Sequence, residues 1–161
     1  MNKTLWLMCG APASGKSWFA KNKLMKGHGW DYISRDEIRF SLVKEDEDYF
    51  SHESEVFYEF VDQIVESLKD NNTDVIADAT HLNWSSRKKL LKAIERYMRL
   101  SDINIIPVVV YSKYATMVAR NKLRGGRACV PDDVISKMIG SMSDPQSDPF
   151  NYTAIMRVSN T

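Results

Sequence analysis

The first part of the chain constrains its fold more than any other segment. An apolar run at residues 4–9 leads directly into Gly10-Ala-Pro-Ala-Ser-Gly-Lys-Ser17, and a predicted helix follows. In such a strand–loop–helix unit, glycine allows backbone N–H groups to point at phosphate oxygens, and the helix presents its positive N-terminus to the same anion. The spacing Gly-x-x-x-x-Gly-Lys-Ser in this context therefore predicts a cradle for the phosphates of a nucleoside triphosphate.

Within this loop, the side chains have separate expected tasks. Lys16 is expected to reach the β- and γ-phosphates of ATP, and the Ser17 hydroxyl to hold Mg²⁺. Trp18 stands where many such loops place Ser or Thr, and it is expected to pack in the core rather than to stack on adenine. The alternative is a chance Gly/Ser turn before a helix, but the correct flanks on both sides argue against it. The residues predicted to bind the donor are Gly10, Ala13, Ser14, Gly15, Lys16, Ser17, Arg120 and Arg124.

Apolar segments of strand length alternate with amphipathic segments along the sequence. Strands are predicted at 4–9, 30–34, 75–77, 103–111 and 154–158, and helices at 16–26, 37–43, 54–69, 85–99, 115–123 and 131–142. This alternation predicts an α/β fold, in which a parallel sheet is covered by helices on both faces. The 161 residues suit a single domain spanning 1–161. Ligands of such sheets bind at the carboxyl ends of the strands, so functional side chains are expected there.

Two charged residues follow the second predicted strand. Asp36 lies at the strand end, where a carboxylate facing a γ-phosphate can accept the proton of an attacking hydroxyl group. It is the candidate general base, although an aspartate at this position also suits a helix N-cap. Arg39 lies one helical turn further on and is a candidate clamp for an anionic group of the acceptor. The alternative for Arg39 is an ordinary surface arginine.

The third predicted strand ends in a further candidate. Asp78 is expected either to contact a water molecule bound to Mg²⁺ or to orient Arg39, and the sequence does not separate these roles. A plain turn aspartate is the alternative. His81 lies in the following loop and is expected to be solvated rather than catalytic.

Three arginines surround the Gly125-Gly126 pair, namely Arg120, Arg124 and Arg127. The planar guanidinium group fits phosphate oxygens in a bidentate manner. On a loop with glycine hinges, these arginines are expected to form a lid that closes over the triphosphate. A solvated basic loop is the alternative.

Four elements in this order resemble the kinase domain of the polynucleotide 5′-hydroxyl kinases. They are the Gly-x-x-x-x-Gly-Lys-Ser loop, residues 33–39, residues 75–83, and residues 120–125 followed by 130–135. The resemblance implies the P-loop kinase fold with strand order 2-3-1-4-5, and ATP with Mg²⁺ as the phosphate donor. It also implies a stand-alone kinase, without the phosphatase domain of the bifunctional members.

The same resemblance implies roles for individual residues. Asp36 would be the general base, Arg39 would hold the phosphate beside the acceptor end, Asp78 would support Arg39, and Arg124 would contact the donor phosphates. The catalytic set expected on these grounds is Lys16, Asp36, Arg39, Asp78 and Arg124.

The acceptor is less constrained than the donor. The 5′-hydroxyl end of DNA or RNA is the expected acceptor, and a small molecule such as a nucleoside, sugar nucleotide or antibiotic is the alternative. Lys88, Lys92, Arg96 and Arg99 recur at helical spacing and suit contacts to a nucleic-acid backbone, although a solvated helix face explains them equally well. The acidic stretch at 45–55 would repel a phosphate chain.

A third class, an NTPase or switch without an acceptor, is also compatible with a P-loop. The sequence contains no extended Walker B strand with paired carboxylates and no obvious switch region. A kinase predicts little ATP turnover without an acceptor, whereas an NTPase predicts the reverse.

The composition sets broader limits. The formal net charge is +1, so any nucleic-acid contact depends on a local basic patch. The two cysteines, Cys9 and Cys129, do not suggest a disulfide framework. No apolar stretch approaches the ~20 residues needed to span a bilayer. We therefore expect a soluble protein in the reducing cytoplasm, with a homo-oligomer left open.

Overall fold

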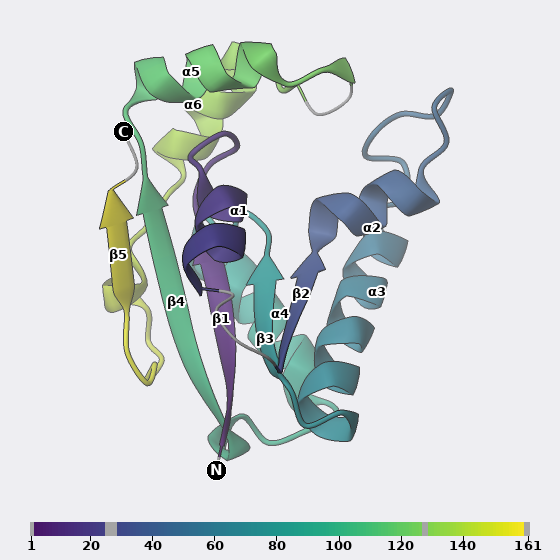
Figure 1. Ribbon diagram of the computed structural model, residues 1–161, viewed down its shortest axis with the longest axis vertical. Helices are drawn as coiled ribbons and strands as arrows, with labels where there is room; N and C mark the ends of the chain where they lie inside the picture. The colour runs from purple at the N-terminus through teal and green to yellow at the C-terminus, as the bar shows by residue number, and fades with distance from the viewer. Residues whose placement is uncertain (1, 25–28, 127–128, 160–161) are drawn as a thin grey trace.

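The computed structural model describes residues 2–24, 29–126 and 129–159, and its centre is a parallel sheet (Figure 1). The five strands are β1 (Lys3–Cys9), β2 (Trp30–Ser34), β3 (Asp74–Asp78), β4 (Ile103–Tyr111) and β5 (Met156–Ser159). Their order is β2-β3-β1-β4-β5, which confirms the predicted order.

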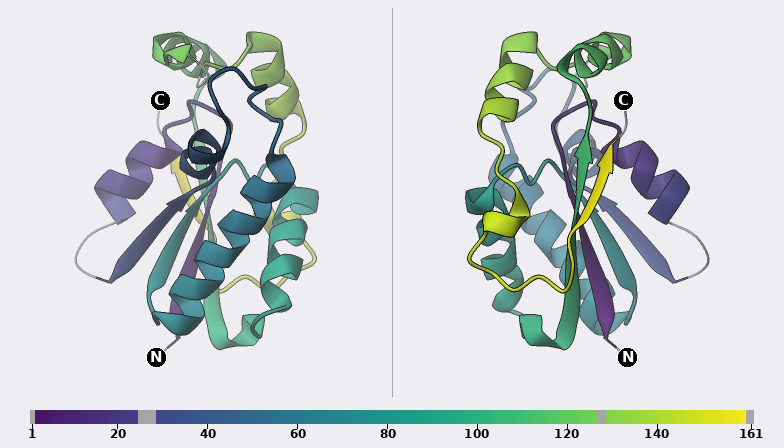
Figure 2. Two further views of the ribbon diagram at one scale, coloured as in Figure 1. Left: turned by 90° about the vertical axis from the view of Figure 1, so that its right-hand side faces the viewer. Right: turned by 90° about the vertical axis from the view of Figure 1, so that its left-hand side faces the viewer.

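The described part of the chain contains six α-helices. They are α1 (Lys16–Phe19), α2 (Arg35–Leu42), α3 (Glu53–Val65), α4 (Trp84–Glu95), α5 (Tyr114–Leu123) and α6 (Asp132–Gly140). Helix α1 lies on one face of the sheet and α3 and α4 lie on the other (Figure 2). Helices α5 and α6 lie beyond the carboxyl ends of the strands (Figure 1). The predicted α/β fold with helices on both faces is therefore confirmed.

Two hydrophobic clusters fill the space between the layers. On the face covered by α3 and α4, strand residues such as Leu5, Leu7 and Val75 pack with Phe60 and Ile94. The other cluster contains Met8, Ala20, Ile76, Val108 and Val110. Because successive strand residues point to opposite faces and both faces are covered, the strands carry nearly continuous apolar runs.

The strand register places the ends of three strands at one level. Met8 of β1 pairs with Asp78 of β3, and Ser34 of β2 pairs with the same aspartate. The segments that follow these strands contain the phosphate loop, Asp36 in the first turn of α2, and His81. The parallel register therefore brings residues far apart in the sequence to one edge of the sheet.

The helix ends differ from the predicted ends where capping and local turns decide them. Helix α1 continues as a π-helical turn at Ala20–Leu24, and α3 as another at Glu66–Asp70. Helix α4 begins at a capping box formed by Asn83 and Ser86, and it ends four residues before the predicted Arg99. Short 3₁₀ turns at Leu100–Asp102 and Pro145–Ser147 were not predicted. Residues 25–26 of the first predicted helix lie outside the described ranges.

Candidate active site

The loop between β1 and α1 has the backbone geometry of a phosphate cradle. Ala13 and Gly15 adopt positive φ angles of 64° and 95°, a region that favours glycine and allows N–H groups to converge. Gly10 donates its N–H to the Thr80 carbonyl at 2.9 Å. A Cβ at Gly10 would lie 2.6 Å from the Ser14 hydroxyl and 3.0 Å from the Val110 carbonyl oxygen, so only glycine fits there.

Asp78 lies against the two polar side chains that open α1. The Ser17 hydroxyl donates to Asp78 Oδ2 at 2.6 Å, and Lys16 Nζ lies 4.0 Å from Oδ1. The Tyr32 hydroxyl also donates to Oδ2, and burial together with the charge of Asp78 raises the pKa of this tyrosine. Tyr32 was not expected at the site, because the sequence shows only an aromatic residue within a strand.

The expected support of Arg39 by Asp78 is wrong for the described residues. Among the described residues, the side-chain partners of Asp78 lie on α1 and β2, whereas Arg39 contacts the carboxylates of Glu53 and Asp36. Two roles were expected for Asp78. Its position beside Ser17 and Lys16 agrees with contact to a water molecule bound to Mg²⁺ near the phosphates. The reason is the register, which aligns the end of β3 with the end of β1 and so with the phosphate loop.

The chemistry of these oxygens suits a hard cation. Mg²⁺ prefers oxygen ligands and commonly combines one or two protein oxygens with phosphate oxygens and water. The Ser17 hydroxyl and the Asp78 carboxylate provide such oxygens beside the phosphate loop. Within the described ranges, no group of three or more His, Cys, Asp or Glu residues forms a metal site alone, so nucleotide phosphates and water would complete the coordination.

Arg39 forms the centre of a second cluster, on the α2 side of the pocket. Its Nε and Nη2 donate to Glu53 at 2.6 and 3.0 Å, and its Nη1 donates to Asp36 Oδ1 at 2.6 Å. The Tyr49 hydroxyl donates to the same Asp36 oxygen at 3.1 Å. Although burial acts against it, the hydrogen bonds to Glu53 and Tyr49 raise the pKa of Arg39. Asp36 therefore has one oxygen occupied by fixed donors.

The predicted N-cap role of Asp36 is wrong. Ser34 is the N-cap of α2, and its hydroxyl accepts from the Glu37 N–H at 3.2 Å. Asp36 lies in the first helical turn instead, with 45% of its side chain exposed. It lines a pocket of about 230 Å³ together with Lys16, Asp78 and Arg124. The carboxylate is thus available on the side that faces the phosphate loop.

Three further residues of this pocket were missed by the sequence analysis. Arg35, Tyr49 and Glu53 line it, and Arg35 donates to Glu53 at 3.2 Å. Glu53 belongs to the acidic stretch that was expected only to repel phosphate. The sequence did hint at an ion pair, since acidic residues follow a predicted helix that carries two arginines. It does not show which of these carboxylates contacts the arginines.

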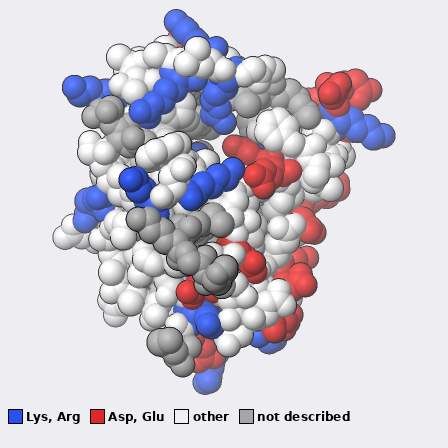
Figure 3. Space-filling view, in the orientation of Figure 1, with Lys and Arg blue, Asp and Glu red and all other residues white. Residues whose placement is uncertain are grey.

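Arg120 of α5 and Arg124 at its C-cap lie beside the phosphate loop. Arg120 Nη1 donates to the Ser14 carbonyl at 3.4 Å and to the Ser112 hydroxyl at 3.1 Å. Arg124 lines both the larger pocket and a smaller one formed by Ala13, Gly15, Lys16, Ser17 and Trp18. Figure 3 shows basic side chains over α5 and acidic side chains along the α3 edge. Arg127, the third expected lid arginine, lies outside the described residues.

The expected core position of Trp18 and the expected solvent exposure of His81 are wrong. Trp18 is 54% exposed and lies beside the smaller pocket, because it points away from the sheet on the first turn of α1. His81 is buried, and its Nδ1 lies 2.7 Å from the Met8 carbonyl. Burial lowers the pKa of His81 to about 4. It is therefore a neutral structural histidine.

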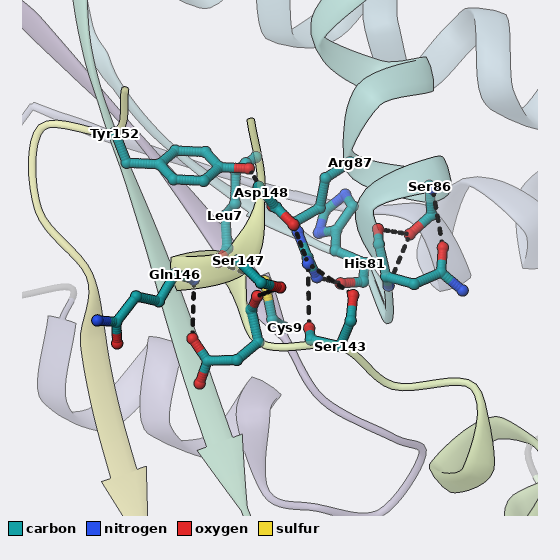
Figure 4. Close-up of polar contacts among 12 residues, drawn as sticks. Leu7, Cys9, His81, Ser86, Arg87, Ser143, Gln146, Ser147, Asp148 and Tyr152 are labelled. Carbon is teal, nitrogen blue, oxygen red and sulfur yellow. Dashed lines mark hydrogen bonds and ion pairs between the residues drawn. The ribbon is translucent and has the colours of Figure 1, made fainter. Parts of the chain in front are cut away.

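The cations expected to contact a nucleic acid, Lys88, Lys92, Arg96 and Arg99, are not among the residues that line the pocket of Asp36. Arg87 of α4 is fully buried and donates to Asp148 at 2.6 and 2.8 Å and to the His81 and Ser143 carbonyls (Figure 4). Lys88 and Lys92 are exposed on α4, and Arg96 and Arg99 are exposed between its last turn and Ile103. Ile103 pairs with Lys3 at the start of β1, so this end of α4 lies at the opposite edge of the sheet from the phosphate loop.

Comparison with known proteins places this geometry in context. Residues 5–145 match the family model described as an AAA domain. No curated protein matches the sequence. Every helix in the described ranges is too short or too polar to cross a membrane.

Several solved structures share the fold. A chain of the Pnkp1/Rnl/Hen1 RNA repair complex has a TM-score of 0.70 and 23% identity, over 87% of this chain and 44% of that chain. A fungal RNA kinase has a TM-score of 0.64 and 11% identity, over 98% and 74%. A sugar kinase from a Janibacter species has a TM-score of 0.64 and 10% identity, over 99% and 86%.

These similarities bear on the fold. The chain spans less than half the length of the RNA-repair chain. The P-loop kinase fold and the resemblance to a P-loop kinase domain are confirmed. A chain of an RNA-repair complex, an RNA kinase and a sugar kinase share the fold, so the fold alone does not identify the acceptor.

Proposed function

Because the chain belongs to the AAA domain family and has the fold of P-loop kinases, we propose that it transfers the γ-phosphate of ATP to a hydroxyl group, with the 5′-hydroxyl end of DNA or RNA as the acceptor. One observation carries the proposal. Asp36 lines the same pocket as Lys16, Asp78 and Arg124, so a carboxylate able to accept a proton faces the groups suited to bind the donor phosphates.

The donor side of the pocket would bind ATP. Backbone N–H groups of the loop from Ala13 to Ser17 would cradle the phosphates, with Lys16 on the β- and γ-phosphates. Arg120 and Arg124 would neutralise phosphate charge from the α5 side. Ser17, supported by Asp78, would hold Mg²⁺, which supplies charge neutralisation at the phosphates when it is bound.

The acceptor side would position and activate the hydroxyl group. Asp36 Oδ1 already accepts from Arg39 and Tyr49, whereas Oδ2 has no hydrogen-bond partner in the described part of the chain. Oδ2 would accept the hydrogen of the acceptor hydroxyl and then its proton as the bond to phosphorus forms. Arg39 would hold the carboxylate in this orientation. This acceptor-side carboxylate favours a kinase over an NTPase without an acceptor.

The polynucleotide acceptor is supported by the similarity to the RNA-repair chain and the fungal RNA kinase. A small-molecule acceptor is the second candidate. It is favoured by Arg96 and Arg99, which follow α4 at the edge of the sheet away from the site, and by the acidic side chains along the α3 edge (Figure 3). The two candidates share the phosphate transfer and differ in what surrounds the reactive hydroxyl group.

The test is to offer γ-labelled ATP with a 5′-hydroxyl oligonucleotide, a nucleoside, a nucleoside 3′-monophosphate and a sugar nucleotide in parallel. Label on the oligonucleotide, with little ATP turnover when no acceptor is present, is the expected result. Label on the small molecules alone would overturn the polynucleotide assignment and retain the kinase. Rapid ATP hydrolysis that no acceptor changes would overturn both.

A further inference from the structure

The hydrogen bonds of Arg39 occupy nearly all of its donors. A guanidinium group has five N–H groups. The Nε N–H and one Nη2 N–H donate to Glu53. One Nη1 N–H donates to Asp36, and the other donates to Tyr49 at 3.4 Å. Only 8% of the Arg39 side chain is exposed. Arg39 therefore has one N–H left for a ligand and cannot bind a phosphate in a bidentate manner without releasing Tyr49, Asp36 or Glu53.

Aromatic rings also enclose this guanidinium group. The Tyr49 ring centroid lies 4.9 Å from Arg39 Cζ, and the Phe50 centroid lies 5.5 Å from it. These contacts fix the plane of the guanidinium group. The arrangement is that of a brace for Asp36.

Arg35, in contrast to Arg39, leaves most of its guanidinium donors without an acceptor in the described residues. It lines the same pocket as Asp36, but within the described ranges its one side-chain hydrogen bond runs from Nη2 to Glu53 at 3.2 Å. Its Nε is buried without a partner, and its Nη1 has none in the described residues. The Arg35 side chain is 28% exposed, compared with 8% for Arg39. Arg35 thus has unused donors at the pocket wall.

The surroundings of Arg35 leave its charge incompletely balanced. Its Cζ lies 5.6 Å from the centroid of the buried Phe57 ring, and it shares the single carboxylate of Glu53 with Arg39. Partial burial lowers the pKa of Arg35. A ligand anion beside Arg35 would satisfy donors that the protein leaves unpaired.

We propose that Arg35, rather than Arg39, binds the phosphate group next to the reactive nucleoside of the acceptor, while Arg39 acts as a positioning residue for Asp36. This inference rests on the proposed function. It makes the acceptor a nucleotide or nucleic-acid end that carries a phosphate beside the nucleoside whose hydroxyl reacts. It also predicts that the two neighbouring arginines affect different kinetic constants.

The experiment measures KM and kcat with a 5′-hydroxyl dinucleotide, a nucleoside 3′-monophosphate and an unphosphorylated nucleoside. Arg35→Gln is expected to raise KM for the two phosphate-bearing acceptors about 10- to 100-fold, with KM for the nucleoside and for ATP unchanged. Arg35→Lys, which keeps the charge and loses the fork, is expected to lie between Gln and the wild type. Arg39→Gln is expected to lower kcat for every acceptor with little change in KM.

Arg157→Gln is the matched control, since Arg157 is exposed on β5 and does not line the pocket of Asp36. It removes the same charge and is expected to change neither constant. Thermal melting of each variant verifies that it is folded, and Arg35→Lys retains the test if Arg35→Gln does not fold.

The outcomes separate this inference from the proposed function. Unchanged acceptor KM in Arg35→Gln, or a KM effect found in Arg39→Gln instead, would overturn the inference and retain the kinase. An equal rise in KM for the unphosphorylated nucleoside would also overturn it. If the wild-type protein labels no acceptor, the proposed function fails and the inference fails with it.

Discussion

The Ser17 hydroxyl donates a hydrogen bond of 2.6 Å to Asp78 Oδ2, across 61 positions of sequence. Ser17 opens α1 and Asp78 ends β3, so this contact joins the phosphate loop to the neighbouring strand of the sheet. The Tyr32 hydroxyl donates to the same oxygen from β2. Three neighbouring elements thus converge on the oxygen pair that suits Mg²⁺.

Tyr32→Phe tests the support that this convergence gives to Asp78. The variant keeps the ring and removes the hydroxyl donor, so the carboxylate is held less firmly beside Ser17. Changes of this kind around metal sites commonly cost about 10-fold or more in metal affinity. We expect the Mg²⁺ concentration for half-maximal activity to rise roughly 10-fold, as measured by Mg²⁺ titration of phosphate transfer.

Tyr58→Phe is the matched control, because Tyr58 is 60% exposed on α3. It should require the same Mg²⁺ concentration as the wild-type protein. Identical Mg²⁺ requirements in both variants would contradict the support of Asp78 by Tyr32.

Asp36→Asn tests the general base. The amide cannot accept the acceptor proton, so turnover should fall by about 10²- to 10⁴-fold. The phosphate loop is untouched, so the dissociation constant of ATP measured by calorimetry should stay nearly unchanged. Asp62→Asn, on the exposed face of α3, removes an equivalent charge as the control. Turnover preserved in Asp36→Asn would exclude this residue as the base.

The buried ion pair between Arg87 and Asp148 should dominate the stability of the loop after α6. Both side chains are 0% exposed, and removal of one partner leaves the other charge buried without compensation. Arg87→Met should therefore lower the free energy of unfolding by about 3–5 kcal/mol. The double variant Arg87→Met/Asp148→Leu should recover much of this loss. Urea denaturation measures both, and a single variant as stable as the wild type would refute the argument.

His81 makes a defined contribution to the pH dependence of stability. Its pKa is about 4 in the fold, below the ordinary 6.5, because burial favours the neutral ring. The unfolded chain therefore binds more protons between these values. The contribution is fully present above pH ~6.5 and is lost as the pH falls towards ~4, for a total of ~3 kcal/mol.

The measurement is the free energy of unfolding of the wild type and of His81→Gln at pH 7 and pH 5. The loss of stability between the two pH values should be smaller in the variant. His52 behaves in the opposite way to His81, since hydrogen bonds to Glu55 and Glu47 raise its pKa. Its contribution has the opposite sign and is lost as the pH rises. Equal pH slopes in the wild type and His81→Gln would contradict the assignment.

The fold and the phosphate loop were predictable from sequence because short-range patterns encode them. The alternation of apolar and amphipathic segments predicts a parallel sheet, and the glycine spacing before Lys16 predicts the cradle. The expected convergence of Asp36 and Asp78 at one edge follows from the parallel arrangement alone.

The partners of those residues were not predictable, because they depend on contacts between distant segments. Nothing in the sequence near Asp78 indicates Tyr32, which lies 46 positions away, or excludes Arg39. Similarly, Ser34 rather than Asp36 caps α2, although both residue types suit the position. Trp18 and His81 were misjudged for one reason, since residue type does not determine which face of an element is covered.

The central claim is transfer of phosphate to a hydroxyl acceptor from ATP held in the loop that ends at Lys16 and Ser17. The most direct measurement compares ADP formed with label incorporated into a 5′-hydroxyl oligonucleotide, for the wild type and Lys16→Ala. The account predicts equal amounts of ADP and labelled 5′-phosphate in the wild type, and neither product above background in Lys16→Ala. ADP formed without labelled acceptor, or full transfer by Lys16→Ala, would contradict it.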